Sequence, residues 1–242
     1  MSSTSFDNYA RLARQQEAGN TEVAGRYSFQ SSAERRIIRD VTDKLALDSD
    51  DSLLEVGCGP GNILLPLSYQ VARSAGIDNH AALERLAARC GTPMHIELHP
   101  GDFLSMELPE LLFSKVLIYS VLQYVDSRAS AIQFLRRALS LLRPGGRLLI
   151  GDLPNQDKKR RFTESTAGVL ASKEWRALVS DAGSHPLSGL PEDDRLLVVD
   201  DDLLLALLKC GRTEGYESYL LPQPTDLPFG HTREDLIFVA SR

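Results

Sequence analysis

Hydrophobic and polar positions follow two alternating patterns along this chain. Short segments rich in apolar residues recur at 52–56, 72–77, 94–99, 115–119 and 147–152, and they are typical of strands in a parallel sheet. Between these segments, apolar residues recur at helical spacing, which predicts helices with one buried face. The helices expected from this spacing span residues 62–69, 80–89 and 129–142.

The two ends of the chain depart from this alternation. Residues 1–50 carry apolar positions at helical spacing before the first expected strand, which predicts a helical cap. Residues 155–195 interrupt the pattern with a basic run and a helix-like stretch. A last helix is expected over 203–209. Strands are expected over 216–221 and 236–240, and they should pair antiparallel because a proline-rich loop without a helix joins them.

We therefore expect a single α/β domain of 242 residues, built on a doubly wound, mostly parallel seven-stranded sheet whose last strand is antiparallel. A chain of this length can bury a sizeable core. The expected parts are an N-terminal helical cap (1–50), a ligand-binding core (51–154), an insert after strand five on the substrate side (155–195), and a C-terminal helix with the antiparallel strand pair (196–242).

Composition and charge exclude several classes of partner. The formal net charge of −6 argues against nucleic acid, because no basic field attracts phosphates. The three cysteines lack zinc spacing and no acidic cluster demands a cation, so we expect no metal. No secretory signal and no apolar run of membrane-spanning length is present. We expect a cytoplasmic protein without a membrane partner, and the sequence carries no signal for an oligomeric state.

One stretch of the expected core carries the strongest chemical signal. Residues 53–62 read LLEVGCGPGN, in which Gly57, Gly59 and Gly61 prevent a regular strand or helix. A strand, a glycine turn and a helix start point backbone N–H groups outward, which suits an anionic group on a nucleoside-like ligand. Glu55 stands just before the turn, where it would repel a phosphate but attract a cation.

Further motifs follow in order. An acid, Asp78, ends the second expected strand. A second acid, Asp102, precedes Phe103 after the third, and a Leu-Arg-Pro-Gly-Gly turn at 142–146 precedes the fifth. Together with the acid-x-Gly-x-Gly-x-Gly motif at 55–61, these features resemble the class I S-adenosylmethionine-dependent methyltransferases, a family with a Rossmann-like fold. The resemblance covers residues 52–152.

The resemblance implies a methyltransferase whose cofactor is S-adenosylmethionine. It assigns Glu55 to the cofactor's ammonium group, Asp78 to the ribose hydroxyls and Asp102 to the adenine amino group. Cys58 is interpreted as a small packing residue of the turn. The expected cofactor site comprises Glu55, Gly57, Cys58, Gly59, Gly61, Asp78, Asn79, Asp102, Phe103 and Ser120.

The acceptor is expected at the carboxyl ends of the parallel strands, where doubly wound sheets bind ligands. A small molecule is favoured, with a hydroxyl oxygen as the acceptor atom and in-line displacement as the reaction. Alignment of the acceptor supplies much of such a rate, so a strong base is not required. His231, in the loop 222–234, is the candidate general base, and the alternative is a surface histidine. Candidate acceptor-binding residues are Tyr27, Gln123, Tyr124 and Asp152.

The cap and the insert are expected to close over the acceptor, with Tyr9, Tyr27 and Gln30 on the cap side. The insert contains the basic run 158–161, interpreted as a solvated helix face with an anion-attracting rim as the alternative. It also contains Trp175, interpreted as a packing residue with a substrate contact as the alternative.

Two other functions stay open from the sequence. A nicotinamide-dependent oxidoreductase would carry Gly-x-Gly-x-x-Gly, which requires glycine at the position of Asn62. A non-catalytic regulator that binds S-adenosylmethionine would keep the same glycine turn and acids as an enzyme. Calorimetry with S-adenosylmethionine and with NADH distinguishes a methyltransferase from the oxidoreductase. Formation of S-adenosylhomocysteine with candidate acceptors distinguishes an enzyme from the non-catalytic regulator.

Overall fold

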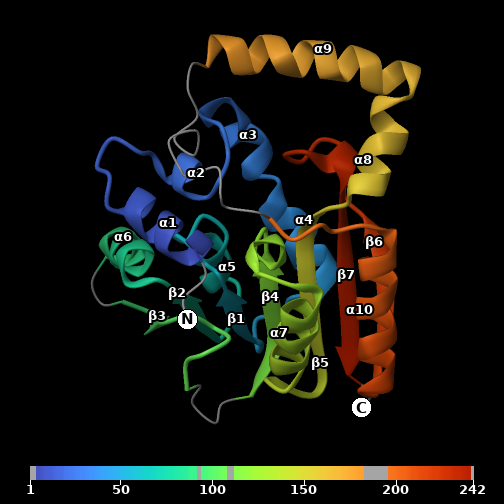
Figure 1. Ribbon diagram of the computed structural model, residues 1–242. Helices are drawn as coiled ribbons and strands as arrows, with labels where there is room; N and C mark the ends of the chain where they lie inside the picture. Colours follow the sequence, from blue (N-terminus) through green and yellow to red (C-terminus); the bar gives the residue numbers. More distant parts are fainter. Residues whose placement is uncertain (1–3, 92–93, 108–111, 183–195, 241–242) are drawn as a thin grey trace.

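The computed structural model describes residues 4–91, 94–107, 112–182 and 196–240 (Figure 1). Within them, a seven-stranded sheet has the order β3-β2-β1-β4-β5-β7-β6. Strand β7 runs antiparallel to both β5 and β6, and the other neighbours are parallel. This confirms the expected doubly wound sheet with its antiparallel last strand. The strands are β1 (Ser52–Val56), β2 (Arg73–Asp78), β3 (Ile96–Pro100), β4 (Phe113–Tyr119), β5 (Leu142–Pro154), β6 (Tyr216–Pro222) and β7 (Arg233–Ala240).

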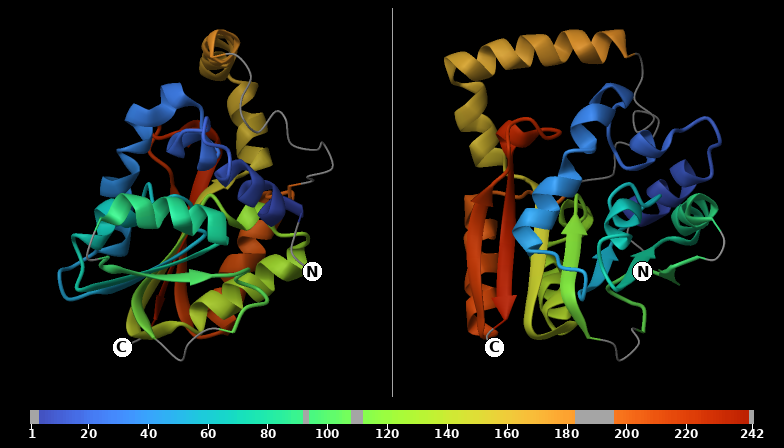
Figure 2. Two further views of the ribbon diagram at one scale, coloured as in Figure 1. Left: turned by 90° about the vertical axis from the view of Figure 1, so that its left-hand side faces the viewer. Right: turned by 180° about the vertical axis from the view of Figure 1, so that it is seen from behind.

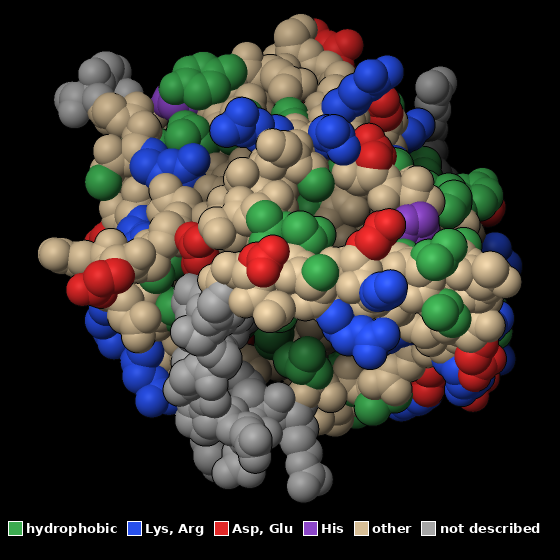
Figure 3. Space-filling view, turned by 90° about the horizontal axis from the view of Figure 1, so that it is seen from above, with side chains coloured by type: hydrophobic (Ala, Val, Ile, Leu, Met, Phe, Trp, Pro, Cys, Tyr) green, Lys and Arg blue, Asp and Glu red, His purple; other side chains and the backbone are tan. Residues whose placement is uncertain are grey.

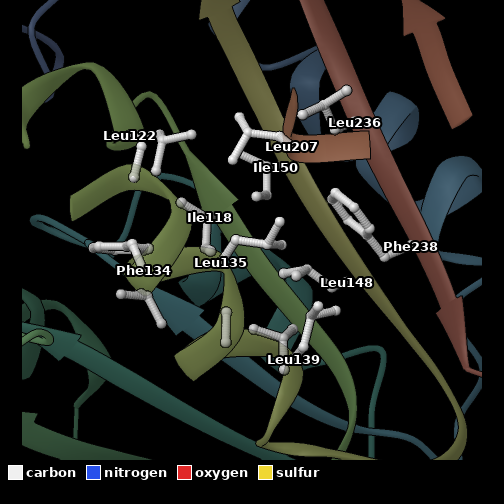
Figure 4. Packing of buried hydrophobic residues seen from close by; sticks show 14 of the residues in the cluster. Ile118, Leu122, Phe134, Leu135, Leu139, Leu148, Ile150, Leu207, Leu236 and Phe238 are labelled. Carbon is white, nitrogen blue, oxygen red and sulfur yellow. The ribbon is translucent and has the colours of Figure 1, made fainter. Parts of the chain in front are cut away.

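Helices cover both faces of the sheet (Figures 1 and 2). Helices α7 (Arg128–Leu139) and α10 (Asp201–Thr213) pack on one face, and α4 (Ile37–Leu45), α5 (Leu64–Ser68) and α6 (His80–Cys90) pack on the other. Figure 4 shows the first face, where side chains of α7 meet those of β4, β5 and β7. The apolar spacing read from the sequence produces these buried faces.

Several helices and strands differ in their bounds from the sequence prediction, among them α5, α7 and β5. Helix α5 has five residues and begins at Leu64, because the glycine turn continues to Gly61 with φ +80°. Helix α7 ends at Leu139, and β5 begins at Leu142. The expected Pro-Gly-Gly turn therefore lies inside β5. The register between β4 and β5 shifts there, because Phe113 pairs with Leu142 whereas Lys115 pairs with Arg147.

The N-terminal segment is helical and lies against the core. It contains α1 (Thr4–Ala13), α2 (Asn20–Val23), a 3-10 turn η1 (Ser28–Gln30) and α3 (Ser31–Glu34), which lead into α4. Arg85 of α6 fastens this segment, because its guanidinium donates to the carbonyl oxygens of Ala13 at 2.6 Å and Ala18 at 2.7 Å.

After β5, the chain forms α8 (Gln156–Thr163) and α9 (Thr166–Asp181), and the rest of the predicted insert, 183–195, lies outside the described residues. Helix α9 crosses the top of the molecule in Figure 1. Gly168 packs against the end of α8, where an added Cβ would lie 1.8 Å from the Phe162 carbonyl oxygen. Three members of the basic run on α8 form ion pairs: Arg160 with Asp157 and Arg161 with Asp201, each at 2.7 Å, and Lys158 with Glu234 at 3.9 Å. These contacts favour the solvated helix face.

Asp235 on β7 is a fully buried carboxylate. The Lys44 ammonium lies 2.5 Å from it, and the backbone N–H of Asp152 donates to it at 2.8 Å. Burial raises the pKa of Asp235 from 3.8 to about 6, against the opposing effect of Lys44, while Asp40 raises it further.

The stability of the protein is expected to depend on pH through Asp235. The folded state holds this proton more tightly than the unfolded chain, so this group's contribution falls as pH rises from about 4 to about 6, by roughly 3 kcal/mol at most. Urea unfolding of the wild type and of Asp235→Asn at pH 4.5 and pH 7 measures it. The stability of the wild type relative to the variant should decrease at the higher pH, and an unchanged or increasing difference would contradict the assignment.

Within the described residues, none of the helices has both the length and the apolar character that crossing a bilayer requires.

Candidate cofactor and acceptor site

A cavity of about 660 Å³ opens at the carboxyl ends of β1, β2 and β4. This volume lies in the usual range for small-molecule and cofactor sites. Helix α1 contributes to its wall from the N-terminal segment, so the cavity lies between that segment and the sheet. Among the predicted site residues, those that line it are Glu55, Gly57, Cys58, Gly59, Asp78, Asn79, Asp102, Phe103, Ser120 and Tyr124.

The glycine turn has three left-handed residues, with φ of +76° at Gly57, +53° at Gly59 and +80° at Gly61. An added Cβ at Gly57 would lie 2.2 Å from Val121, and one at Gly61 would lie 2.2 Å from Leu86. At Gly59 nothing lies within 4 Å of that position, so Gly59 faces open space. Two of the glycines are therefore required by contacts inside the protein, and Gly59 leaves room for a ligand.

Cys58 packs inside this turn and is buried. Burial raises the pKa of its thiol well above the ordinary value, with further effects from Asp78 and Glu55. A thiol held in its neutral form is a poor nucleophile. The geometry therefore supports a packing role for Cys58.

Asp78 is fixed by the turn it faces. The backbone N–H of Gly59 donates to its Oδ2 at 2.7 Å, and Asn79 donates to its Oδ1 from the backbone at 2.6 Å and from the side chain at 2.7 Å. Asn79 also caps α6 by accepting from the N–H of Ala82. Burial raises the pKa of Asp78, and these N–H donors oppose the rise. The carboxylate is held rigidly against the cavity, where it can accept from hydroxyl groups.

Another part of the cavity lining combines the aromatic ring of Phe103 with the carboxylate of Asp102. Phe103 is buried, and its ring centroid lies 4.7 Å from that of Phe134. The Arg137 guanidinium lies 5.3 Å from the centroid of the Phe103 ring. Asp102 accepts a hydrogen bond from the N–H of Leu104 at 3.1 Å and lines the cavity. A flat ring beside an acceptor oxygen suits a nucleobase that carries an amino group.

Glu55 presents an unpaired oxygen to the cavity. Its side chain is 2% exposed, and its Oε2 has no hydrogen-bond partner among the described residues. Burial raises its pKa well above the usual value, Asp78 adds to the rise, and Arg26 opposes it. A buried carboxylate oxygen without a donor is unfavourable, so this position suits an ammonium group on a ligand, which would stabilise the ionised form.

Arg26 is a cavity residue that the sequence did not single out. It is 3% exposed, and it donates to Ser120 Oγ at 2.8 Å and to Glu34 Oε1 at 3.3 Å. Its Nε has no partner among the described residues. No motif marks Arg26, since a lone arginine after a glycine is usually solvated. With Glu55, it gives one cavity both charges that complement an α-amino acid zwitterion.

Aromatic hydroxyl groups close one side of the cavity. The Tyr9 hydroxyl of α1 lies 2.5 Å from the Tyr124 hydroxyl, and their rings meet edge to face at 5.0 Å. Tyr124 lies in the 3-10 turn η2 (Leu122–Tyr124) that follows β4, and burial raises its pKa. This pair joins the N-terminal segment to the carboxyl end of β4.

The remaining predicted residues lie outside the cavity lining. Gln123 is buried and donates to the carbonyl oxygen of Ser120 at 2.9 Å, and Asp152 lies behind Ser120. Gly61 ends the turn. His231, in the 3-10 turn η4 (Gly230–Thr232), is exposed and stacks on Phe162 with ring centroids 4.5 Å apart.

Tyr27 belongs to an aromatic cluster outside the cavity lining, defined by Tyr27, Phe29, Trp175 and Phe229. Trp175 of α9 lies 5.6 Å from Tyr27, 5.4 Å from Phe29 and 5.3 Å from Phe229. Of the residues of α9, all of which are described, Gly168 alone is buried. The face that α9 crosses carries exposed hydrophobic side chains among charged ones (Figure 3). The aromatic cluster is thus the main side-chain contact between α9 and the N-terminal segment.

Among the described residues, no group of three or more His, Cys, Asp and Glu side chains is arranged to hold a metal ion.

Several known proteins are similar to this chain in sequence. A family model described as a methyltransferase domain matches residues 54–150. A trans-aconitate 2-methyltransferase from Azoarcus sp. (strain BH72) is 31% identical over 159 residues, covering 64% of this chain and 58% of that protein. The O-methyltransferase resE from Aspergillus sclerotiorum is 28% identical over 205 residues and covers 75% of this chain and 75% of that protein.

Solved structures of methyltransferases have a similar fold. N-methyltransferase NodS from Bradyrhizobium japonicum WM9, in complex with S-adenosylhomocysteine, matches with a TM-score of 0.63 at 15% identity over 100% of both chains. The chain spans 58% of the aconitate relative and 2% of one much longer relative.

The sheet order is that of a Rossmann-like fold, and the glycine turn and the acids at the carboxyl ends of its strands suit a nucleoside ligand. With the family match, the class becomes specific. Residues 54–150 match the methyltransferase domain family, and the fold of the chain is that of the class I S-adenosylmethionine-dependent methyltransferases.

Proposed function

We propose that this protein transfers a methyl group from S-adenosylmethionine to a hydroxyl oxygen of a small molecule. Two buried atoms in one cavity carry the proposal, Glu55 Oε2 and Arg26 Nε. Neither atom has a hydrogen-bond partner among the described residues. They complement the ammonium and carboxylate groups of the cofactor's methionine part. Asp78 then faces the ribose, and Asp102 and Phe103 face the adenine.

Hydroxyl groups on the cavity wall support an oxygen acceptor. Ser120, Tyr9 and Tyr124 can donate to or accept from an acceptor hydroxyl, and Phe6 adds an apolar contact. The relative from Aspergillus sclerotiorum is also an O-methyltransferase. When the cofactor is bound, it supplies an electrophilic methyl group, and the protein's contribution is to align the acceptor and exclude water.

Binding and turnover test the proposal separately. Calorimetry should detect S-adenosylmethionine and S-adenosylhomocysteine but not NADH. Glu55→Gln should weaken S-adenosylhomocysteine binding by roughly 10- to 100-fold, since it removes a charge-assisted hydrogen bond. It should leave 5′-methylthioadenosine, which lacks the amino acid group, nearly unchanged. Equal losses for both ligands would contradict the assignment of Glu55.

Turnover is tested with methyl-labelled S-adenosylmethionine and a small-molecule extract. Label should appear in a product that behaves as a methyl ether, together with S-adenosylhomocysteine. Cofactor binding without label transfer would instead indicate a non-catalytic regulator.

Helices α8 and α9 and the N-terminal cap are proposed to close over the acceptor, with the aromatic cluster as the contact between α9 and the cap. Trp175→Ala should release α9, because edge-to-face ring pairs contribute about 0.5–1.5 kcal/mol each. Trypsin should then cut α9 at Lys173 and Arg176 roughly tenfold faster, as detected by mass spectrometry. Leu178→Ala, an exposed site on the same helix, is the control. Equal cleavage of both variants would argue against the contact.

A further inference from the structure

Two non-glycine residues with left-handed backbone lie side by side at the cavity. Ser120 and Asp152 both have φ +61°, and they come directly after Tyr119 and Gly151, the last residues paired between β4 and β5. Such conformations cost about 1–3 kcal/mol and persist where surrounding contacts impose them. Here the N–H of Ser120 donates to the Gly151 carbonyl at 3.1 Å, and the N–H of Asp152 donates to Asp235 Oδ1 at 2.8 Å.

The strained backbone brings the two side chains into contact. Ser120 Oγ donates a hydrogen bond to Asp152 Oδ2, and it accepts one from Arg26 Nη2 at 2.8 Å. A hydroxyl group has one hydrogen and two lone pairs, so these contacts use the hydrogen and one lone pair. Ser120 lines the cavity whereas Asp152 does not. The second lone pair of Ser120 can therefore accept from a group bound in the cavity.

Asp152 is placed to receive a proton through Ser120. It is 4% exposed, and its Oδ1 has no hydrogen-bond partner among the described residues. Two guanidinium groups face it, Arg26 at 3.6 Å and Arg233 at 3.4 Å, and these charges offset the desolvation of the carboxylate. Behind it, Asp235 is paired with Lys44. The network joins the cavity to a buried carboxylate.

The other candidate bases are less well placed. His231 is exposed and does not line the cavity. Burial raises the pKa of Tyr124, so its phenolate form is disfavoured. Glu55 faces the end of the cavity proposed for the cofactor's ammonium group.

We propose that Ser120 is a catalytic residue that takes the proton of the acceptor hydroxyl and relays its own proton to Asp152. The proposal rests on the function proposed above. As the acceptor oxygen forms its bond to the methyl carbon, the bond from that carbon to sulfur breaks and its electron pair remains on sulfur. The acceptor proton moves to Ser120 Oγ, and the proton of Ser120 moves to Asp152 Oδ2. A positive sulfonium and a negative carboxylate are neutralised together, and Asp152 later returns its proton to solvent.

Hydroxyl-free variants of Ser120 separate this role from a structural one. Ser120→Ala and Ser120→Gly should each lower the rate of label transfer to the small-molecule extract by about 100-fold, within the range for general-base catalysis. Glycine relieves the left-handed strain that alanine keeps, so Ser120→Gly should unfold at a higher temperature than Ser120→Ala. Both variants should bind S-adenosylhomocysteine within about threefold of the wild type.

Asp152 is tested as a positioning residue by loss of its carboxylate and rescue by the conservative variant. Asp152→Asn should lower the rate by a similar factor while binding of S-adenosylhomocysteine stays within about threefold of the wild type, and Asp152→Glu should restore part of the rate. Ser140→Ala and Asp43→Asn, both at exposed positions outside the cavity, are matched controls.

The outcomes distinguish the relay from the proposed function. If wild-type protein transfers no label, the proposed function fails. If the wild type is active and Ser120→Ala keeps its rate, the relay alone is wrong. A loss of S-adenosylhomocysteine binding that matches the loss of rate in Ser120→Ala also overturns the relay, since it assigns the hydroxyl to cofactor binding.

Discussion

Replacing Asp78 with alanine is expected to reduce the affinity for S-adenosylmethionine by at least about 100-fold. The substitution removes the acceptor proposed for two ribose hydroxyls, and hydrogen bonds to charged groups contribute about 1.5–3 kcal/mol each. It also leaves the N–H groups of Gly59 and Asn79 without their acceptor, so the glycine turn loses its anchor. Isothermal titration calorimetry with S-adenosylmethionine measures the effect.

The control for this experiment is Asp50→Ala, which removes an exposed acid before β1. It should bind the cofactor like the wild type. Affinity of Asp78→Ala within tenfold of the wild type, in a variant that remains folded by circular dichroism, would mean that the ribose is held elsewhere.

Replacing Arg26 with methionine is expected to lower the free energy of unfolding by roughly 3–5 kcal/mol. Removing one member of a buried ion pair leaves the other charges unpaired, and here Glu34 and Asp152 both face Arg26. Urea unfolding measures the loss. Adding Glu34→Gln in the same chain should restore part of the stability, because it removes one of the unpaired charges.

The same substitution tests the cofactor assignment. Arg26→Met should weaken binding of S-adenosylhomocysteine more than binding of 5′-methylthioadenosine, since only the first ligand carries the carboxylate proposed to face Arg26. A stability within 1 kcal/mol of the wild type would contradict the view that Arg26 is the central charge of this network.

Local pattern was sufficient for most of the fold. The segments expected as strands at 52–56 and 115–119 lie in β1 and β4, because apolar runs of this length are stable where both faces are covered. The irregularity that places 142–146 inside β5 was not predictable, since it depends on the pairing of Phe113 with Leu142 across the sheet.

The cavity could be predicted as far as motifs reach. Glu55, Asp78 and Asp102 line it because they lie near the carboxyl ends of β1, β2 and β3, which meet at the same edge of the sheet. Arg26 was missed because its partners, Glu34, Ser120 and Asp152, come from separate parts of the chain. Such a contact depends on how the N-terminal segment packs on the sheet, which local sequence does not specify.

Loop direction explains the remaining difference between sequence and geometry. His231 lies in a loop at the expected edge, but Phe229 adopts a left-handed backbone and His231 stacks on Phe162 of α8. The helix–loop contact draws the imidazole to the surface. Its role as a base remains a prediction that the geometry does not favour, and Ser120 is the alternative in the cavity.

The position of β7 between β5 and β6 has a consequence for the newly synthesised chain. Leu148 and Ile150 of β5 are paired with Phe238 and Leu236 of β7, which is synthesised after the other six strands of the described sheet. Until then, β5 exposes an unpaired apolar edge, the kind of surface that joins other chains. A chaperone that shields this edge during translation would therefore alter the yield of folded protein, and so would slow synthesis of the segment before β7. Both effects should be larger than for a sheet in which each new strand pairs with the strand before it in sequence.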